Sequence, residues 1–344
     1  MPDVGVQRTT GGVPGVVSLP MPDIHEPDIH GMSRYRPSFA HGSDIRMDLN
    51  AMDPGAAFDM DGFVSHVIAR GEELYRDFPW RNGSDPYAVL VSEVMLQQTQ
   101  VSRVERYYGR WLAELPTFSA LAEAPLAVVL GIWQGLGYNR RAVLLTSLAQ
   151  TLVADAAEKG VAVALPSDEA RLRALPGIGP ATAAGVRVFA FNEPSVYLET
   201  NVRAVFLHEF FPEGIDVSDA QIRPIAERAG QVAICQGSCP RQWNYALLDY
   251  GAHLKKTVPN PSRRSRHHVR QSRFEGSKRQ KRARLLKLVL ADPGITTEDA
   301  VQLLSDSEVG AGRGPVSVAE TLGLLEELAA EGFFVREDDA WSVP

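Results

Sequence analysis

The sequence predicts an all-α protein with more than one folded unit. Between Phe63 and about Lys256, apolar residues recur every three or four positions, and Gly, Pro, Asp or Asn separate the periodic stretches. This is the pattern of amphipathic helices that end at turns. Strand-like runs are scarce, and 344 residues are too many for one small core. We therefore expect two or three folded units.

Four regions follow one another along the chain. Residues 1–58 are rich in Pro, Gly, Asp, His and Met and lack a hydrophobic period, which predicts a disordered leader. Residues 59–254 form a helical domain, 255–280 a basic segment and 281–344 a C-terminal domain. The helices expected in the helical domain are Met60–Arg76, Pro86–Leu96, Val101–Glu114, Phe118–Gln134, Arg140–Ala157, Ser167–Ala174, Pro180–Phe191, Thr200–Phe211, Ser218–Ala229 and Arg241–Lys255.

The C-terminal region reads as three helices followed by a short hairpin. The helices are expected at Lys281–Ala291, Thr297–Ser305 and Val316–Glu331, and this order resembles a winged helix. The third helix carries four acidic residues, Glu320, Glu326, Glu327 and Glu331. Because DNA phosphates repel such a face, we interpret the domain as a packing or protein-contact module, with DNA reading as the alternative.

Composition excludes several classes of protein. No apolar run approaches the roughly twenty residues that span a bilayer, and the N-terminus lacks the pattern of a secretory signal. The chain has only two cysteines, Cys235 and Cys239, too few for a disulfide framework or a four-thiolate metal centre. We expect a cytoplasmic, nucleoid-associated protein without a membrane partner or a side-chain metal site.

The net charge of −7 argues, taken over the whole chain, against a nucleic-acid partner, but the charge is unevenly distributed. Thirteen of the 35 Lys and Arg residues lie between positions 255 and 287, where Glu275 is the only acid. Such a field suits a polyanion, and Lys255, Arg263 and Arg264 are candidate phosphate contacts. A solvated linker is the alternative.

The stretch Leu175–Ala183 is typical of a phosphate-binding hairpin. Pro176 ends one helix, the glycines permit a tight turn with outward N–H groups, and the next helix adds its positive dipole. Such a surface binds phosphate without reading a base. The alternative is an ordinary helix–helix turn. The residues expected to face the phosphate are Gly177, Gly179, Ala181 and Thr182.

One carboxylate, Glu93, lies inside an otherwise apolar helix. Burial without a partner costs several kcal/mol, so Glu93 should be protonated, paired or functional. A raised pKa suits a general acid near neutral pH, whereas a structural Glu is the alternative. Directly after it, Gln97, Gln98 and Thr99 offer polar groups that could fill the gap left by an extruded base, or simply cap the helix.

Two further stretches fit the same kind of surface. Trp80 and Arg81 place a flat aromatic beside a guanidinium, a pair that can hold a purine. The Gly-rich turn at 135–141 carries Tyr138 at its tip and Arg140 beside it, which suits a wedge into DNA and a phosphate contact. Considered alone, each of these patterns more often belongs to a packed core or an ordinary turn.

Together these stretches resemble the helix-hairpin-helix DNA glycosylase superfamily of endonuclease III, and within it the MutY-type mismatch adenine glycosylases. The resemblance covers about residues 63–250, and its motifs occur in the family's order: Pro79–Arg81, Val91–Val101, Gly135–Tyr138, Leu175–Gly179 and Glu199–Arg203. It implies a two-lobed fold that holds a flipped nucleotide from double-stranded DNA with a mispaired or damaged base, bound by a monomer. An alkali-metal ion at the hairpin carbonyls is also implied.

The resemblance assigns three catalytic residues. Glu93 stands where the family's Glu protonates the leaving base, Glu199 where an Asp stabilises the oxocarbenium-like sugar, and Asn201 where an amide hydrogen-bonds near the acids. Glu199 is one methylene longer than that Asp, and a shift of about 1 Å can cost a hundredfold in rate. Ala181 replaces the family's Lys, Ser or Tyr and has no nucleophile, which favours a monofunctional reaction without lyase activity.

Two other departures concern whole segments. The stretch after Tyr250 lacks the four cysteines of the family's iron–sulfur cluster, so we expect a clusterless variant that uses Arg and Lys for phosphate contacts. The domain that recognises 8-oxoguanine is not evident. The sequence therefore predicts a monofunctional DNA glycosylase of base excision repair, with mispaired adenine as substrate. The alternatives are a thymine or uracil mismatch glycosylase of the same superfamily and a non-catalytic lesion-binding protein.

Overall fold

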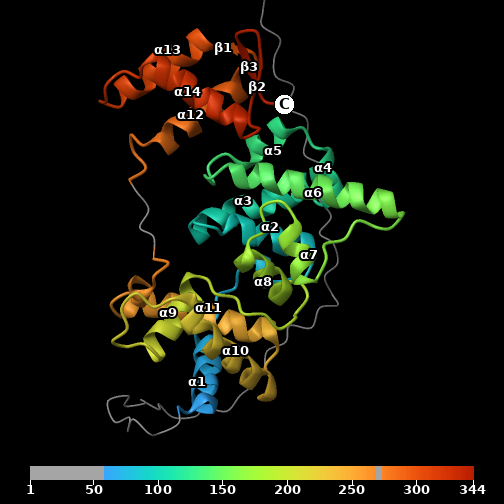
Figure 1. Ribbon diagram of the computed structural model, residues 1–344, viewed down its shortest axis with the longest axis vertical. Coiled ribbons are helices and arrows are strands. Elements are labelled where there is room, and N and C mark those ends of the chain that lie inside the picture. Colours follow the sequence, from blue (N-terminus) through green and yellow to red (C-terminus); the bar gives the residue numbers. More distant parts are fainter. Residues whose placement is uncertain (1–57, 269–272) are drawn as a thin grey trace, which may run out of the picture. The chain divides into compact units, whose positions relative to one another are not determined.

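The computed structural model describes residues 58–268 and 273–344 (Figure 1). The leader expected at 1–58 thus falls almost wholly outside the described residues. The first described region, 58–268, contains α1 (Met60–Glu73), η2 (Pro79–Arg81), α2 (Pro86–Met95), α3 (Val101–Glu114), α4 (Phe118–Glu123), α5 (Leu126–Trp133), α6 (Arg140–Lys159), α7 (Glu169–Ala174), α8 (Pro180–Phe189), α9 (Thr200–Glu209), α10 (Asp219–Cys235), α11 (Pro240–Thr257) and η3 (Pro261–Arg264).

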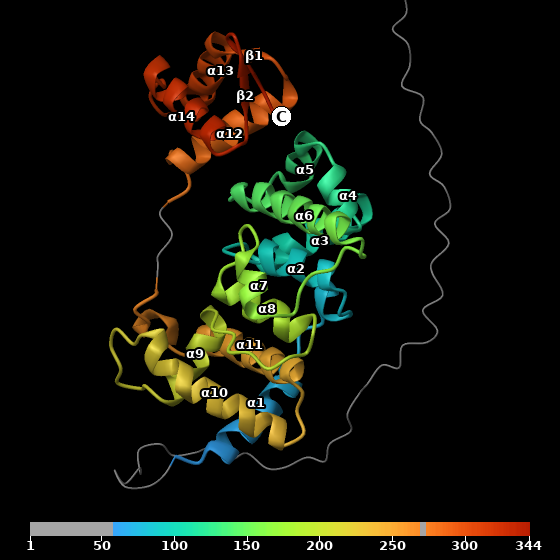
Figure 2. The ribbon, with the colours of Figure 1, turned by 45° about the vertical axis from the view of Figure 1, so that its right-hand side comes forward.

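These helices form two bundles, each with its own apolar core (Figures 1 and 2). Helices α1, α9, α10 and α11 pack around Phe63, Phe206 and Trp243. Helices α2 to α8 pack around buried residues that include Trp111 and Trp133, whose rings meet edge to face at 5.3 Å. Each large side chain buried in this way contributes about 1.5–3 kcal/mol. The all-α prediction is confirmed for this region.

One predicted helix is wrong, because Phe118–Gln134 is two helices. Helix α4 ends at Glu123 and α5 begins at Leu126, with Pro125 between them. Proline has no N–H to donate and pushes the preceding residue toward extended backbone. Ala124 accordingly has ψ of 134°. The spacing of apolar residues continues across the break, so the hydrophobic pattern does not reveal that α4 ends there. The other predicted helices are present with shifted ends.

Helix α2 runs through the second bundle. It begins at Pro86 behind Asp85, whose side chain accepts a hydrogen bond from the N–H of Ala88 at 2.9 Å. Most of its residues are buried, including Leu90 and Met95. It packs against α3, α6 and α8, so a polar side chain on it must lie among other helices. This burial sets the environment of Glu93.

The last part of the first region replaces the expected free basic loop with ordered structure. Helix α11 runs to Thr257, and η3 follows with Pro261 and Ser262 buried. Arg266 and Val217 are joined by a backbone hydrogen bond of 2.9 Å, which fixes the chain beside the start of α10. The segment predicted to begin at Lys255 thus starts inside a helix.

The region 273–344 has the element order and strand order of a winged helix. Its elements are α12 (Lys278–Ala291), β1 (Ile295–Thr296), α13 (Thr297–Gly310), α14 (Val318–Ala330), β2 (Val335–Glu337) and β3 (Ala340–Ser342). The strands form an antiparallel sheet in the order β1-β3-β2, with Trp341 opposite both Ile295 and Arg336. Trp341 and Phe333 are fully buried in its core.

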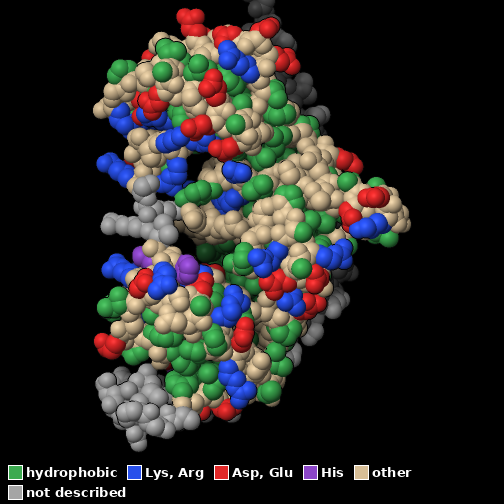
Figure 3. Space-filling view, viewed as in Figure 1, with side chains coloured by type: hydrophobic (Ala, Val, Ile, Leu, Met, Phe, Trp, Pro, Cys, Tyr) green, Lys and Arg blue, Asp and Glu red, His purple; other side chains and the backbone are tan. Residues whose placement is uncertain are grey.

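Basic side chains of α12 form ion pairs with acidic side chains of α14. Lys278 pairs with Glu327 at 2.6 Å, and Lys281 pairs with Glu320 at 2.6 Å. Acidic and basic side chains accordingly lie intermixed on the face of this region shown in Figure 3. The sequence suggested that the whole basic run faces a polyanion. Its α12 portion instead stabilises the C-terminal fold.

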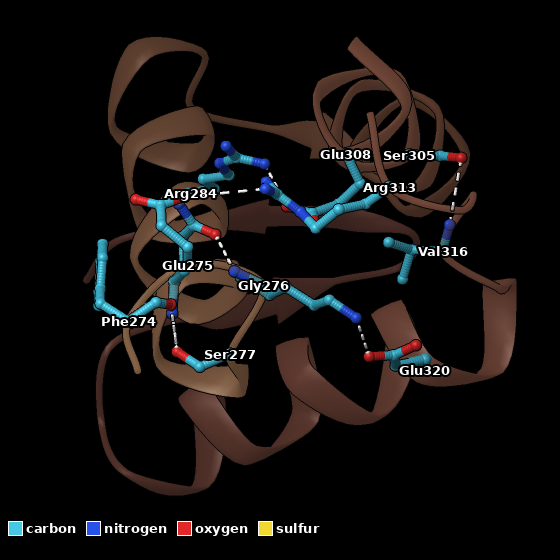
Figure 4. Close-up of polar contacts among 12 residues, drawn as sticks. Phe274, Glu275, Gly276, Ser277, Arg284, Ser305, Glu308, Arg313, Val316 and Glu320 are labelled. Atoms are coloured by element: carbon cyan, nitrogen blue, oxygen red, sulfur yellow. Dashed lines mark hydrogen bonds and ion pairs between the residues drawn. The ribbon is translucent and has the colours of Figure 1, made fainter. Parts of the chain in front are cut away.

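A buried carboxylate joins α12 to α13 in the same region. Glu308 of α13 is 1% exposed and accepts hydrogen bonds from Arg284 and Arg313, which converge on it in Figure 4. The Arg313 hydrogen bond and the charge of Arg284 hold the pKa of Glu308 below its usual value. Arg313 also lies 3.7 Å from Glu275, so the chain entering α12 is tied to the loop after α13.

Candidate active site

A cavity of about 310 Å³ lies among η2, α2, α8, α9 and α11. Its volume is within the range of small-ligand pockets. It is lined by residues of both helical bundles, and several residues that the sequence singled out meet there. These are Trp80, Arg81, Glu93, Gln97, Gln98, Thr99, Ala181, Thr182, Glu199 and Asn201.

Glu93 projects from α2 toward α8, where Gly185 makes room for it. A Cβ at position 185 would stand 2.1 Å from Oε2 of Glu93, so any larger residue there would force the carboxyl to move. Burial raises the pKa of Glu93 to about 8; the Tyr197 hydroxyl opposes the shift by hydrogen bonding, and Glu199 adds to it. Glu93 is therefore mostly protonated at pH 7 and can donate a proton.

Glu199 caps the helix on the other side of the cavity. Its Oε1 accepts hydrogen bonds from the backbone N–H groups of Asn201 at 2.6 Å and Val202 at 3.0 Å. The extra methylene thus folds the carboxylate back onto the N-terminus of α9, where the helix dipole favours negative charge. Burial raises the pKa of Glu199, while these N–H groups and the charges of Lys255 and Arg203 oppose the rise.

The start of α9 is held from two sides. Lys255 of α11 donates from Nζ to Oδ1 of Asn201 at 3.1 Å. A Cβ on Gly251 would lie 2.0 Å from the backbone oxygen of Asn201, so α11 crosses α9 at a point that only glycine permits. From η3, Ser262 donates to the backbone oxygen of Thr200 at 3.2 Å. The contact of Lys255 with DNA stays a prediction, and in the protein alone its ammonium group binds Asn201.

Two residues with a side chain, Gln98 of the cavity lining and Tyr138 of the 135–141 turn, have an uncommon backbone conformation. Gln98 has φ of 53° and Tyr138 has φ of 47°. Both are in the left-handed region, which costs an ordinary residue about 1 kcal/mol or more. Such strain is often retained at functional sites. Gln97, next to Gln98, donates from Nε2 to Thr182 Oγ1 at 3.1 Å and so joins α2 to α8.

Arg141 connects these two turns and was not singled out from the sequence. Its Nη1 donates to the backbone oxygens of Val94 at 2.7 Å and Gln97 at 2.7 Å, and its Nη2 donates to that of Gly137 at 2.8 Å. Replacing Arg141 would leave several buried carbonyls unpaired. The neighbouring Arg140, by contrast, is exposed.

Trp80 and Arg81 line the cavity, but Arg81 is already engaged. It forms a buried ion pair with Asp249 of α11, at 2.7 Å through Nη1 and 2.9 Å through Nη2. Its guanidinium lies 4.3 Å from the ring centre of Tyr245. The Nε atom is buried and has no hydrogen-bond partner among the described residues. Trp80 stacks on Phe78 at 5.0 Å between ring centres.

The predicted hairpin joins α7 to α8 and presents its backbone to solvent. Gly177 has φ of 77°, which glycine alone adopts without strain, and Gly179 is the N-cap of α8. Gly177 and Ala181 are exposed, as is Arg263 on η3. The guanidinium of Arg264, predicted as a phosphate contact, donates to the backbone oxygen of Phe211 at 2.9 Å.

The residues present do not fit a four-cysteine iron–sulfur cluster. Cys235 ends α10 and Cys239 caps α11, and the segment that follows α11 contains no cysteine. Across the described residues, no group of three or more His, Cys, Asp or Glu side chains is placed to hold a metal ion. No helix within 58–268 or 273–344 could cross a membrane.

Comparison with known proteins finds similarity to DNA repair glycosylases. Residues 91–228 match the model of the HhH-GPD superfamily base excision DNA repair protein. An adenine DNA glycosylase of Mycolicibacterium smegmatis is 44% identical over 131 residues, which cover 38% of this chain and 43% of that protein. A thymine/uracil-DNA glycosylase of Methanothermobacter thermautotrophicus is 26% identical over 191 residues, covering 55% and 83%.

A solved structure of a thermostable thymine-DNA glycosylase aligns with a TM-score of 0.48 at 24% identity, covering 56% of this chain and 86% of that one. The chain spans less than half the length of the first adenine glycosylases that it matches. The matched region, 91–228, includes both Glu93 and Glu199. Residues 91–228 are therefore similar to the HhH-GPD superfamily, and adenine DNA glycosylases are among the relatives of the chain.

Proposed function

We propose that this protein is a monofunctional DNA glycosylase of base excision repair. It would bind double-stranded DNA, take a mispaired base into the cavity between the bundles and hydrolyse the N-glycosidic bond, leaving an abasic site. Mispaired adenine is the proposed substrate, supported by the adenine glycosylases among the relatives. The observation that carries the proposal is that two carboxyls line one cavity, those of Glu199 and of Glu93, whose pKa is raised by burial.

The environments of the two carboxyls suggest different roles. Glu93 has one hydrogen bond that favours its charged form, from Tyr197, and burial keeps its proton on. Glu199 has two backbone N–H donors and the charges of Lys255 and Arg203 nearby. Carboxyl pairs whose surroundings differ in this way commonly divide into acid and anion. Glu93 would protonate the departing base, and Glu199 would stabilise the positive charge that develops on the sugar.

Lyase chemistry is not part of the proposal. An imine with the sugar needs an amine within reach of C1′, and Ala181 offers none at the mouth of the cavity. Water would therefore complete the reaction. Retention of DNA would depend on the α7–α8 hairpin, where exposed N–H groups and the start of α8 suit a phosphate.

A panel of duplexes tests the proposal. Each carries adenine, thymine, uracil or an alkylated purine at one labelled site, and alkali cleaves the product strand wherever a base has been released. We expect release of adenine, and we expect Glu93→Gln to abolish release while DNA affinity stays within about threefold. Glu123→Gln, an exposed Glu on α4, is the matched control and should keep full activity.

The same panel decides between the proposal and its alternatives. Release of thymine or uracil alone would favour the activity named for the Methanothermobacter relative, which matches over most of its own length. Tight binding without release of any base would indicate a lesion-binding protein. Undiminished turnover of Glu93→Gln would remove Glu93 from the mechanism.

A further inference from the structure

The side chain of Tyr197 lies between two cavities. It lines the cavity that contains Glu93, and it also lines a second cavity of about 330 Å³ on the side of α10. Among the residues that the structure describes, no other lines both. The ring is fixed edge to face against Phe189 at 5.3 Å, and Phe189 in turn stacks on Tyr245 at 4.7 Å. The orientation of the ring is therefore set by packing.

The hydroxyl of this fixed ring meets the carboxyl of Glu93. The Tyr197 hydroxyl acts on the Glu93 carboxylate as a hydrogen-bond partner that opposes the rise in its pKa, and both side chains approach the same bare point of α8. A Cβ on Gly185 would lie 2.1 Å from Oε2 of Glu93 and 3.0 Å from Cε2 of Tyr197. A glycine, a ring and a carboxyl thus share one tight contact. The carboxyl has little freedom to turn, because α8 closes one side and the hydroxyl holds another.

From this contact we infer that Tyr197 is a positioning residue for Glu93. Its hydroxyl holds the carboxyl at the back of the cavity in one orientation, so that the acidic proton is presented to the base. The inference rests on the proposed glycosylase function and adds to it a residue that the sequence analysis did not single out. Because the hydroxyl touches the acid and not the reacting bond, Tyr197 acts through Glu93.

The other ionisable groups around Glu93 do not replace this contact. Glu199 lies across the cavity and repels a charged Glu93. From α11, Tyr245 is close enough to feel that charge, and its own pKa is raised by burial. From η2, Arg81 is committed to Asp249. Helix α8 presents no ionisable side chain at the contact, only Gly185.

The test is Tyr197→Phe, which keeps the ring and removes the hydroxyl. A tyrosine that donates to a carboxylate stabilises the charged form, so its loss raises the pKa of Glu93. The single-turnover rate, which falls as Glu93 loses its proton, should then fall at a higher pH than in the wild type. At lower pH, where Glu93 is protonated in both proteins, the rate of the variant should be roughly tenfold below that of the wild type, because the acid is less well oriented. The affinity for DNA should be unchanged.

Tyr108→Phe separates positioning from stability. Tyr108 is buried and donates to the backbone oxygen of Ala88 at the start of α2, away from the cavity. Its loss weakens the same helix but should leave the pH profile where it is. A Tyr197→Phe profile that stays in place, or that moves to lower pH, would overturn the inference.

A measurement on the protein without DNA keeps the inference separate from the proposed function. The carbonyl stretch of protonated Glu93 can be assigned in infrared spectra by its loss in Glu93→Gln. In Tyr197→Phe this stretch should move to higher frequency, because a hydrogen bond to the carboxyl is gone. An unmoved stretch would refute the contact even in an active enzyme. A shifted stretch in a protein that releases no base would leave the contact standing and sink only the glycosylase proposal.

Discussion

Replacing Gly185 with Ala puts a methyl group where the carboxyl of Glu93 now lies. The added Cβ would be 2.1 Å from Oε2 and 2.9 Å from Cδ of Glu93. Carbon and oxygen atoms that are not bonded come no closer than about 3 Å, so the carboxyl must move by about 1 Å. Its other neighbour, the ring of Tyr197, would be 3.0 Å from the same methyl and blocks one direction of escape.

A displacement of about 1 Å at a catalytic group can cost a factor of about a hundred in rate. We therefore expect the single-turnover rate of base release in Gly185→Ala to fall about a hundredfold. The fold should survive, because Ala is favoured over Gly within a helix by about 0.5–1 kcal/mol, which offsets part of the crowding. DNA affinity should not change, because Gly185 is buried below the cavity surface.

The matched control is Gly109→Ala. Gly109 lies in α3, where an added Cβ would meet nothing within 4 Å. This variant should keep wild-type turnover and gain slightly in thermal stability. Quench-flow kinetics and thermal unfolding of both variants give the comparison. Turnover of Gly185→Ala within threefold of the wild type would show that the position of the Glu93 carboxyl does not limit the reaction.

Three other outcomes follow from the structure. Because burial raises the pKa of Glu93 from 4.5 to about 8, the folded state holds this proton more tightly than the unfolded chain. The free energy of unfolding, measured with urea and compared with that of Glu93→Gln, should therefore fall by up to a few kcal/mol as the pH rises from 4.5 to 8. A difference between the two proteins that stays constant with pH would contradict the burial of Glu93. Asp249→Asn should cost about 3–5 kcal/mol, measured by the same method, because it leaves buried Arg81 without its counter-charge. Arg263→Ala should reduce the slope of log affinity against log salt by about 1, whereas Lys281→Ala, already paired within the fold, should leave the slope unchanged.

Local signals were sufficient for most of the helices and failed where two signals competed. The hairpin at 175–180 and the helix starts behind Asp85 and Ser218 depend on residues next to one another in the chain, so their chemistry is visible in sequence. The break at Pro125 is also local, but the continuing apolar spacing concealed it. Pairing of α12 with α14 was missed because a charge run does not reveal which surface it will meet.

The site divides in the same way. An isolated carboxyl in an apolar helix predicted a buried acid at Glu93, and the raised pKa agrees with that expectation. Tyr197, Gly185 and Arg141 were not given roles because each acts across a contact with a residue far away in the chain. These residue types are common in helices and loops, and only the residues that they contact in the folded protein indicate their roles.

The sequence by itself determined the helical class, the Gly-rich hairpin at 175–180 and the presence of one acid in an apolar helix, because these follow from periodicity and near-neighbour chemistry. Only the tertiary structure decided that Glu199 caps its own helix, that Lys255 binds Asn201 and that three basic residues of α12 pair with α14. The reason is physical: burial and the partner of a charge are properties of the packed chain, and they decide whether a polar group binds a ligand or holds the fold together.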